Sequence, residues 1–491
     1  MESAPLKLRN TWWDGTLLFL ITLGMVVFRA WLTSIAGLEL HFDEAQYWTW
    51  SQQPDWSYAT KGPLVAWLIA ASQDLFGQGE WQVRLPAWIA ASLFLLVLYL
   101  FARDLWQRRG AAWWALFLGL TVPFYFVLGL VMTTDVLLFL CWTWGLWAAY
   151  RALEWQQKRA WYELGLATGL GALAKLSMGL LPAVVGLFVL IHPAYRRNLL
   201  NRHLWGGLLL LLVLISPMVF WNASHDWVML RHEAGHVASD DWSLLRFGEF
   251  ILGQWLALSP LVVVAAVWLL WRRPEDQGAR FIWYVSLACV LFFIIKAVNS
   301  RVLINWAAPA YLGFLVLLAG RLGELTKPLR ALVILGLASS LLLVFAMLFP
   351  SVVGLPEHQG GLKKMRAWRE PVTQLAILSG KVDFVLAPDY RLASELAFYW
   401  PKSIPVYLWG NPDRRYTQYD IWPGPEQEKG KTGLFVGERE FPMEVVSGAF
   451  AYCQRLDPIS ALVRNGKVVR TFYPIRCGRF TAPSRELPND Y

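Results

Sequence analysis

Residues 38–68, LELHFDEAQYWTWSQQPDWSYATKGPLVAWL, lie between the first long apolar segment of the chain and the next apolar run. Asp43 and Glu44 stand side by side just after the first segment, and Lys61 precedes the next run. Charged side chains at the mouth of a membrane span are costly, so they usually mark a functional site. We expect an interfacial helix over 44–51 with Asp43 near its N-cap, and a second over 64–75 begun by Pro63.

Apolar segments recur through most of the first 350 residues. The chain has 491 residues, of which 56% are hydrophobic and only 16% are charged, unlike an ordinary soluble domain. Many apolar runs are about 20 residues long, enough to cross a bilayer, and we interpret the first as a span rather than a signal peptide. We predict a mainly α, polytopic membrane protein with about eleven spans, at 14–36, 82–102, 111–130, 134–150, 161–174, 177–192, 204–221, 250–271, 279–296, 304–320 and 330–350.

The basic residues predict the orientation of the chain. The formal net charge is +9, but Lys and Arg occur in small groups between the spans, which disfavours nucleic-acid binding. With the N-terminus in the cytoplasm, most of these groups fall in cytoplasmic loops, as the positive-inside rule expects. An odd number of spans then places the first loop, 37–81, and the chain from residue 351 on the periplasmic side.

Residues 351–491 differ in composition from the transmembrane region at 1–350. Proline, glycine and charged residues increase there, with β-like runs at 382–387 and 434–437 and a helix-like segment at 391–400. We interpret this part as a small periplasmic α/β domain. Cys453 and Cys477 could be bridged in it if the compartment is oxidising, whereas Cys141 and Cys289 lie in apolar runs and are expected to be packing residues.

Three carboxylates are candidates for catalysis: Asp43, Glu44 and Asp135. A carboxylate in a partly dry pocket has a raised pKa, which suits a general base that takes a proton from a hydroxyl. Asp135 follows Thr133 and Thr134 where the third predicted span turns into the fourth, on the surface that carries the first loop. The structural alternative for each acid is a helix cap or a solvated side chain.

Several cations fall on the periplasmic surface, where the positive-inside rule predicts few. An anionic ligand explains the excess because Lys and Arg hold phosphate oxygens by charge-assisted hydrogen bonds, and lipid head-group contact is the alternative. We favour a ligand for Lys61 and for one of Lys296 or Arg301. The cations on this surface are Lys61, Arg84, Lys175, Lys296 and Arg301, and candidate contacts to an acceptor or substrate are Tyr47, Tyr58, His225 and Asn305.

Residues 232–236, HEAGH, match the H-E-x-x-H pattern of zinc metalloproteases. His232 and His236 could bind a divalent metal, with Glu233 as the base. The motif lies in a polar loop rather than in a span, Gly235 weakens the helix that it needs, and no third ligand is evident. We therefore expect no required cofactor and treat the metal as a weak alternative.

Several segments together resemble a known family. FDEAQYWTWSQQPDWSYATKGPL resembles the first outer loop of bacterial membrane transferases of the protein O-mannosyltransferase and lipid A aminoarabinose transferase type. VRLPAW, TTDVLLF, LAKLSMGLLP and NWAAPAYL follow in the same order as in those proteins. RLASELAFYW and RRYTQYDIW resemble outer-domain segments of one bacterial branch.

The resemblance implies a GT-C fold whose cavity opens toward the outer leaflet, and a donor sugar on a polyprenyl phosphate that is transferred with inversion. It implies that Asp43 acts as the base or orients the acceptor, that Lys61 contacts the donor phosphate, and that Asp135 is the acidic residue after the third span. The chain departs from the family's K-P-P-like motif, because Lys61 is followed by Gly62 and Pro63. We expect this departure to loosen the turn.

We therefore predict an inverting glycosyltransferase of the bacterial inner membrane, with its active site on the periplasmic side. The acceptor is lipid A, another surface glycan or a protein, and neither the acceptor nor the sugar follows from the sequence. The alternatives are a transporter or flippase for lipid-linked sugars and, less favoured, a membrane metalloprotease. Many transporters consist of two halves that are related in sequence, and this sequence contains no convincing pair of related halves.

Overall fold

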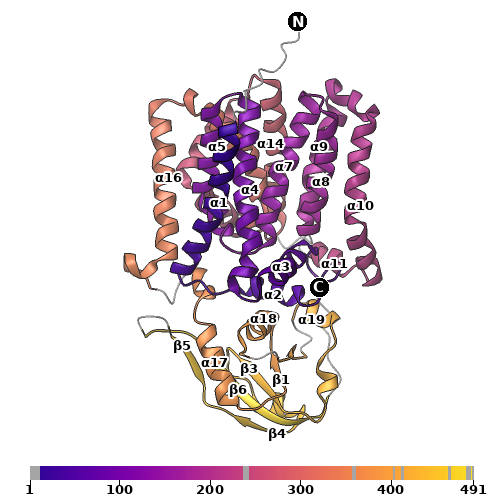
Figure 1. Cartoon of the computed structure of the whole chain (residues 1–491), viewed down its shortest axis with the longest axis vertical. Helices are drawn as coiled ribbons and strands as arrows, with labels where there is room; N and C mark the ends of the chain where they lie inside the picture. Colours follow the sequence, from indigo (N-terminus) through magenta and orange to yellow (C-terminus); the bar gives the residue numbers. More distant parts are fainter. Residues whose placement is uncertain are drawn as a thin grey trace.

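The computed structural model describes residues 12–235, 243–356, 361–401, 404–410, 414–462, 466–482 and 488. A helical bundle forms one part of the molecule, and a small sheet domain with flanking helices lies at one end of it (Figure 1). We call this second part the C-terminal domain and the adjoining end of the bundle the loop end, because helices α2 and α3 of the first loop lie between the two parts.

The bundle follows the apolar pattern of the sequence, but some predicted spans are interrupted. The predicted span at 111–130, for example, is divided into two helices at Pro123. Six helices are long and apolar enough to cross a membrane, and two bent pairs raise the number to eight among the described residues, so the predicted count of eleven is not established. The expected straight span at 250–271 is wrong, because α12 and α13 meet at an angle of 98°. Pro260 begins α13 and lacks the N–H that would continue α12. The main bundle helices are α1 (Trp12–Ile35), α4 (Glu80–Trp106), α5 (Arg109–Thr121), α7 (Thr134–Glu154), α8 (Lys158–Ala174), α9 (Leu180–Ile191), α10 (Arg202–Ser224), α12 (Leu244–Leu258), α13 (Pro260–Trp271), α14 (Gln277–Asn299), α15 (Leu312–Arg321) and α16 (Lys327–Leu348).

Short helices connect these spans. They are α6 (Pro123–Leu128), α11 (Val228–Gly235), and the 3₁₀ turns η1 (Leu176–Gly179), η2 (Pro193–Leu200), η3 (Ile304–Trp306), η4 (Ala308–Tyr311), η5 (Leu322–Glu324) and η6 (Pro350–Val353). Close packing of the spans uses glycine where two backbones meet. A Cβ on Gly165 in α8 would lie 2.1 Å from the carbonyl oxygen of Gly207 in α10. In a membrane, such close approach allows the dispersion contacts that hold helices together.

The first loop forms two helices that lie across the loop end of the bundle (Figure 1). They are α2 (Phe42–Ser51) and α3 (Leu64–Phe76), close to the predicted ranges. The N-cap of α2 is His41, and Asp43 lies near it in the first turn, as predicted. His41 has the extended backbone of a cap, its Nδ1 accepts from the Asp43 N–H, and Glu44 completes a capping box by accepting from the His41 N–H.

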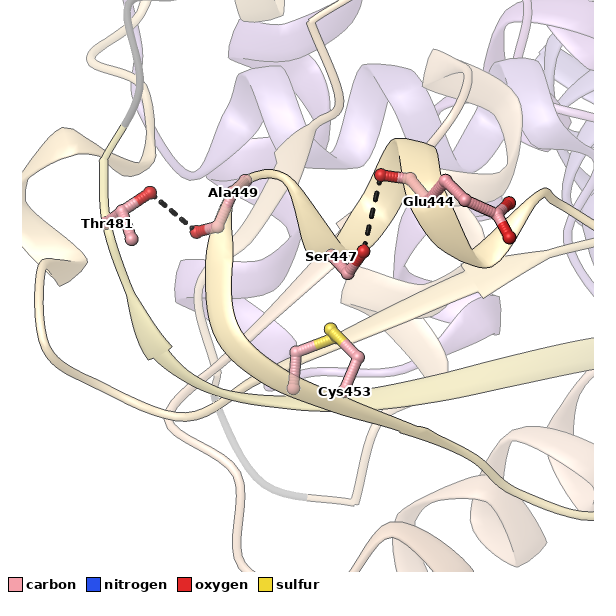
Figure 2. The surroundings of a disulfide bond; sticks show 6 residues. Glu444, Ser447, Ala449, Cys453 and Thr481 are labelled. Carbon is pink, nitrogen blue, oxygen red and sulfur yellow. Dashed lines mark hydrogen bonds between the residues drawn. A yellow bond between two sulfur atoms is a disulfide. The ribbon is translucent and has the colours of Figure 1, made fainter.

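The C-terminal domain is built on a six-stranded mixed sheet with the order β2-β1-β3-β6-β4, and β5 also pairs with β6. The β-like runs and the helix at 391–400 are confirmed as β1, β3 and α18. Cys453 and Cys477 face each other on β4 and β6 and form a disulfide (Figure 2), whereas Cys141 and Cys289 are buried and free. The elements are η7 (Gly361–Met365), α17 (Arg369–Ser379), β1 (Phe384–Ala387), α18 (Tyr390–Tyr399), β2 (Val406–Leu408), α19 (Gln418–Ile421), η8 (Pro425–Glu428), β3 (Gly433–Gly437), α20 (Met443–Ser447), β4 (Phe450–Arg455), β5 (Ile459–Leu462) and β6 (Val468–Phe480).

The C-terminal domain and the first loop share one apolar core. Trp50 and Tyr58 of the loop belong to the same buried cluster as Leu396 and Phe472 of the domain. Hydrogen bonds reinforce the contact, because the Leu40 N–H donates to the Tyr399 hydroxyl at 2.7 Å. The domain therefore fixes the first loop in place, and the prediction that both lie at the same end of the bundle is confirmed.

Candidate active site

Lys61 forms an ion pair with Glu233 at the loop end of the bundle. Lys61 Nζ lies 3.0 Å from Glu233 Oε1, with 22% and 33% of the two side chains exposed. Burial alone raises the pKa of Glu233, but the charges of Lys61, His232 and Lys175 and the hydrogen bond from Lys61 hold this pKa below its ordinary value. Glu233 is therefore ionised at neutral pH, and cations surround it.

A second ion pair is buried between α7 and the end of α8. Lys175 Nζ donates to Asp135 Oδ1 at 2.7 Å, and Asn305 Nδ2 donates to the other carboxylate oxygen at 3.0 Å. Asp135 lies in the first turn of α7, where the helix dipole favours a negative charge. Lys175 stands at the break after α8 in an extended backbone conformation, so it does not continue the helix.

The two ion pairs belong to one cluster. Glu233 interacts electrostatically with Lys175 and Lys296 as well as with Lys61. Lys296, near the end of α14, places its Nζ 4.3 Å from the centre of the Trp306 ring in a cation–π contact. We call Lys61, Lys175 and Lys296 the lysine cluster. Three lysines share this region with two carboxylates, those of Glu233 and Asp135, so one positive charge remains to attract a further anionic group.

Asp43 lies on the first turn of α2, and its charge acts on Tyr47 together with the charge of Asp135. The Asp43 carboxylate is 37% exposed and 3.5 Å from His41 Nδ1. Tyr47, one helical turn later, is buried and hydrogen-bonds Thr134. Burial first, and then the negative charges of Asp43 and Asp135, raise the pKa of Tyr47 well above its ordinary value. The phenol therefore stays protonated beside both carboxylates, and Asp43 alone of the three predicted acids is partly open to solvent.

The expected roles of Glu44 and Arg84 are corrected, because these two side chains are committed to each other. Arg84 donates to both carboxylate oxygens of Glu44 at 2.9 Å, and the pair is almost completely buried. Arg84 also donates to the carbonyl oxygens of Leu38 and Glu39 at 2.6 Å. The Met132 N–H donates to Glu44 at 2.9 Å. The pair therefore ties the first loop to the bundle instead of facing a ligand.

Three further candidates are placed differently from the lysine cluster. Tyr58 is completely buried and its hydroxyl donates to the backbone of Trp50, which corrects the expected substrate contact. His225 follows α10, and its ring stacks on Trp221 at 3.9 Å, so it caps the end of that helix. Arg301 is exposed, and its guanidinium makes no ion pair with any residue that the structure describes.

The metalloprotease alternative finds little support in the described part of the motif. Glu233, the expected base, is paired with Lys61, and α11 ends at Gly235. His236 lies outside the described residues. Among the residues that the structure does describe, no three His, Cys, Asp or Glu side chains are grouped closely enough to hold a metal ion.

Sequence reasoning missed two neighbours of the site. The sequence pattern indicates Glu233 only as the base of a protease, although an acid in a polar loop on the same predicted surface as Lys61 could have suggested an ion pair. Tyr390, at the start of α18, lies near Asp43: burial, and then the charge of Asp43, raise the pKa of Tyr390 to about 12. No signal in the sequence indicates this contact, because more than 340 residues separate Tyr390 from Asp43.

Gly62 also has a structural reason that the sequence did not reveal. A Cβ at this position would lie 2.1 Å from the carbonyl oxygen of Leu173 in α8. The missing side chain lets the segment next to Lys61 pack directly on the backbone of α8, two residues before Lys175.

Known proteins resemble this chain in sequence and in fold. Residues 60–221 match the family described as dolichyl-phosphate-mannose-protein mannosyltransferase. Lipid A galacturonosyltransferase RgtD of Rhizobium johnstonii is 26% identical over 389 residues, which are 77% of this chain and 81% of RgtD. Lipopolysaccharide core galacturonosyltransferase RgtA of the same organism is 25% identical over 182 residues, 33% of this chain and 36% of RgtA.

The crystal structure of ArnT from Cupriavidus metallidurans bound to undecaprenyl phosphate has the same fold. It superposes with a TM-score of 0.65 at 16% identity, over 96% of this chain and all of that one. The chain therefore has the ArnT-like GT-C fold. The apo state of the same ArnT gives a TM-score of 0.62 at 15% identity. The predicted fold class is confirmed, and the protein is a multi-pass membrane protein.

Proposed function

We propose that this transferase moves a sugar from a polyprenyl phosphate to lipid A or a related surface glycan on the periplasmic side of the bacterial inner membrane. The proposal is carried by the lysine cluster, in a fold shared with a protein that binds undecaprenyl phosphate. Asp43 is partly exposed and shares the neighbour Tyr47 with Asp135, the partner of Lys175. The names of RgtD and RgtA favour lipid A or lipopolysaccharide over a protein acceptor.

The donor phosphate would occupy the lysine cluster. Lys61 is partly exposed and pairs with Glu233, whose carboxylate a phosphate can replace because both are anions that accept charge-assisted hydrogen bonds. Lys175 donates to Asp135, which also accepts from Asn305, so the positive charge of Lys175 has a fixed position. These charges stabilise the phosphate as it leaves, and we propose that the transfer therefore needs no cofactor.

Asp43 would accept the proton of the acceptor. As the acceptor oxygen bonds to the anomeric carbon, the bond from that carbon to the phosphate oxygen breaks on the opposite face, so the configuration inverts. The electron pair of the broken bond stays on the polyprenyl phosphate, and the hydroxyl proton passes to Asp43. If the acceptor is itself an ionised phosphate oxygen, Asp43 orients it without taking a proton.

The test uses the purified full-length protein in proteoliposomes with lipid A. Undecaprenyl-phosphate galacturonate is the first donor to try, since both Rhizobium relatives are named for that sugar. Asp43→Asn should lower transfer to a lipid A hydroxyl by about 100-fold or more, the scale of a lost general base. Asp74→Asn, an exposed acid of α3 in the same loop, is the matched control and should keep wild-type activity.

Lys61→Gln should raise the KM for the donor and leave the KM for the acceptor unchanged. Sugar transfer by Asp43→Asn at the wild-type rate would contradict the role of Asp43 as the base. An unchanged donor KM in Lys61→Gln would contradict the role of Lys61 in binding the donor phosphate. Absence of any transfer by the wild-type protein with a panel of polyprenyl-phosphate sugars would contradict the donor class itself.

A further inference from the structure

A cavity of about 620 Å³ lies where the C-terminal domain meets the start of α2. Phe42 forms one wall, and η7, the start of α18, the segment after β3 and strand β6 form the others. None of the three lysines of the donor cluster lines it. We call this cavity the basic pocket, because its charged lining consists of Lys363, Lys364, Arg391, Arg439 and Arg470 against Asp389 and Glu438.

The two acids leave most of the positive charge uncompensated. Glu438 pairs with Arg470 at 3.4 Å and Asp389 pairs with Arg391 at 3.4 Å. The remaining cations, Lys363, Lys364 and Arg439, are exposed and make no ion pair with any described residue. Several like charges around one cavity repel each other, and the potential that they create attracts anions.

Arg470 shows that part of the pocket is fixed before any ligand arrives. It lies 3.4 Å above the Trp368 ring and donates to the carbonyl oxygens of Lys363 and Arg366 at 3.1 and 3.2 Å. These bonds hold η7 and β6 together, so the backbone that carries Lys363 is attached to the domain. A pocket whose cations stand on a fixed frame binds an anion with less loss of conformational entropy.

The pocket lies next to both the bundle end and the proposed base. Met365 and Leu362 of η7 pack against Leu32, Val344 and Leu348, which are at the ends of two membrane-spanning helices. Lys364 and Arg391 lie 5.2 and 5.7 Å from the centre of the Phe42 ring. Asp43 directly follows Phe42. A ligand in the basic pocket would therefore lie at the level of lipid head groups and beside Asp43.

We propose that the basic pocket binds the phosphate groups of the glycolipid acceptor and so presents its sugar to Asp43. This inference rests on the proposed function and names the part of the acceptor that is recognised. The volume is that of a site for a ligand of drug-like size, far more than one phosphate group needs. Three unpaired cations suit a sugar head group with more than one phosphate better than a phospholipid with a single phosphate.

Direct binding tests the inference without any turnover. The full-length protein in detergent is mixed with lipid A that carries two phosphates, with the same lipid after phosphatase treatment, and with phosphatidylglycerol, and complexes are counted by native mass spectrometry. The test variant combines Lys363→Gln, Lys364→Gln and Arg439→Gln. The control combines Lys381→Gln, Lys429→Gln and Arg479→Gln, three exposed cations of the same domain outside the pocket lining.

The test variant should bind phosphorylated lipid A at least tenfold more weakly than the wild type, and the control should stay within twofold. Phosphatase-treated lipid A should bind wild type and test variant equally weakly, and phosphatidylglycerol should not distinguish them. Wild-type affinity for lipid A in the test variant would overturn the inference. An equal loss of phosphatidylglycerol binding in the test variant would also overturn the inference, because the pocket would then bind phospholipids in general.

Kinetics separates this inference from the proposed function. The test variant should raise the KM for lipid A and leave the KM for the donor unchanged. Normal transfer with an unchanged acceptor KM would overturn the inference alone. Loss of lipid A binding in the test variant, together with no sugar transfer by the wild type, would overturn the proposed function and retain the pocket.

Discussion

Replacing Glu44 with Gln is expected to destabilise the protein rather than to block its chemistry. The substitution keeps the shape of the side chain but removes its charge. Arg84 then remains charged with 3% of its side chain exposed, and it has lost the carboxylate to which it donates two hydrogen bonds. The unfavourable step is the burial of an uncompensated charge, which water no longer solvates.

The contacts set the size of the effect. Two hydrogen bonds of 2.9 Å join Arg84 to Glu44, and Glu44 also accepts from the backbone of His41 and Met132. Breaking a buried ion pair by removing one partner costs about 3–5 kcal/mol. Because glutamine still accepts through one oxygen, we expect about 3 kcal/mol for Glu44→Gln. Adding Arg84→Met removes the unpaired buried charge. The double variant should therefore lose less unfolding free energy than the two single variants together, by about 1 kcal/mol or more.

Unfolding of the purified protein in detergent, followed through its 30 tryptophans, measures these effects, with sugar transfer measured in parallel. Asp43→Asn is the contrasting variant: its carboxylate is partly exposed, so stability should change by less than about 0.5 kcal/mol while transfer is lost. If Glu44→Gln unfolds like the wild type but transfers no sugar, Glu44 takes part in the chemistry and the structural role is refuted.

Three other changes test parts of the architecture. Gly62→Ala should lower transfer and stability together, because its Cβ would meet the backbone of α8 at 2.1 Å, and a combined melting and activity assay would show whether both fall. Reducing the disulfide between Cys453 and Cys477, 24 residues apart, should destabilise the C-terminal domain by about 3 kcal/mol, measured as faster proteolysis of that domain under reducing conditions. The pKa of Glu233 is lowered in the folded protein, so its ion pair with Lys61 stabilises the fold at any pH above the ordinary value of 4.5. This stabilisation is lost as the pH falls through the lowered pKa. The difference in unfolding free energy between the wild type and Glu233→Gln should therefore shrink only in acid.

Much of the fold could be predicted because a membrane restricts what a chain can do. A helix satisfies its own backbone hydrogen bonds in lipid, so long apolar runs such as 82–102 and 330–350 correspond to α4 and α16. The break between α12 and α13 was missed, since the run at 250–271 is apolar throughout and only Pro260 indicates the bend. The two short helices of the first loop followed from local signals: polar and aromatic residues in α2 and Pro63 before α3.

The candidate site could be predicted only in part. Sequence placed Asp43, Lys61 and Asp135 at one surface, because span topology decides which loops share a side. The sequence did not distinguish Asp43 from its neighbour Glu44. The side chain of Asp43 is partly exposed, whereas that of Glu44 is buried and forms an ion pair with Arg84. Adjacent helical residues point about 100° apart, so the choice between them depends on what packs on each face.

The sequence by itself determined which segments form the long apolar helices and which kinds of charge lie at the loop end. Only the tertiary structure decided which charges pair with which: Lys61 with Glu233, Lys175 with Asp135, and Arg84 with Glu44. The physical reason is the range of the forces involved. Apolar periodicity and the cost of charge in lipid act on each segment separately, whereas an ion pair needs two side chains within about 4 Å. Segments far apart in the chain reach that distance only when the whole bundle and the C-terminal domain have packed.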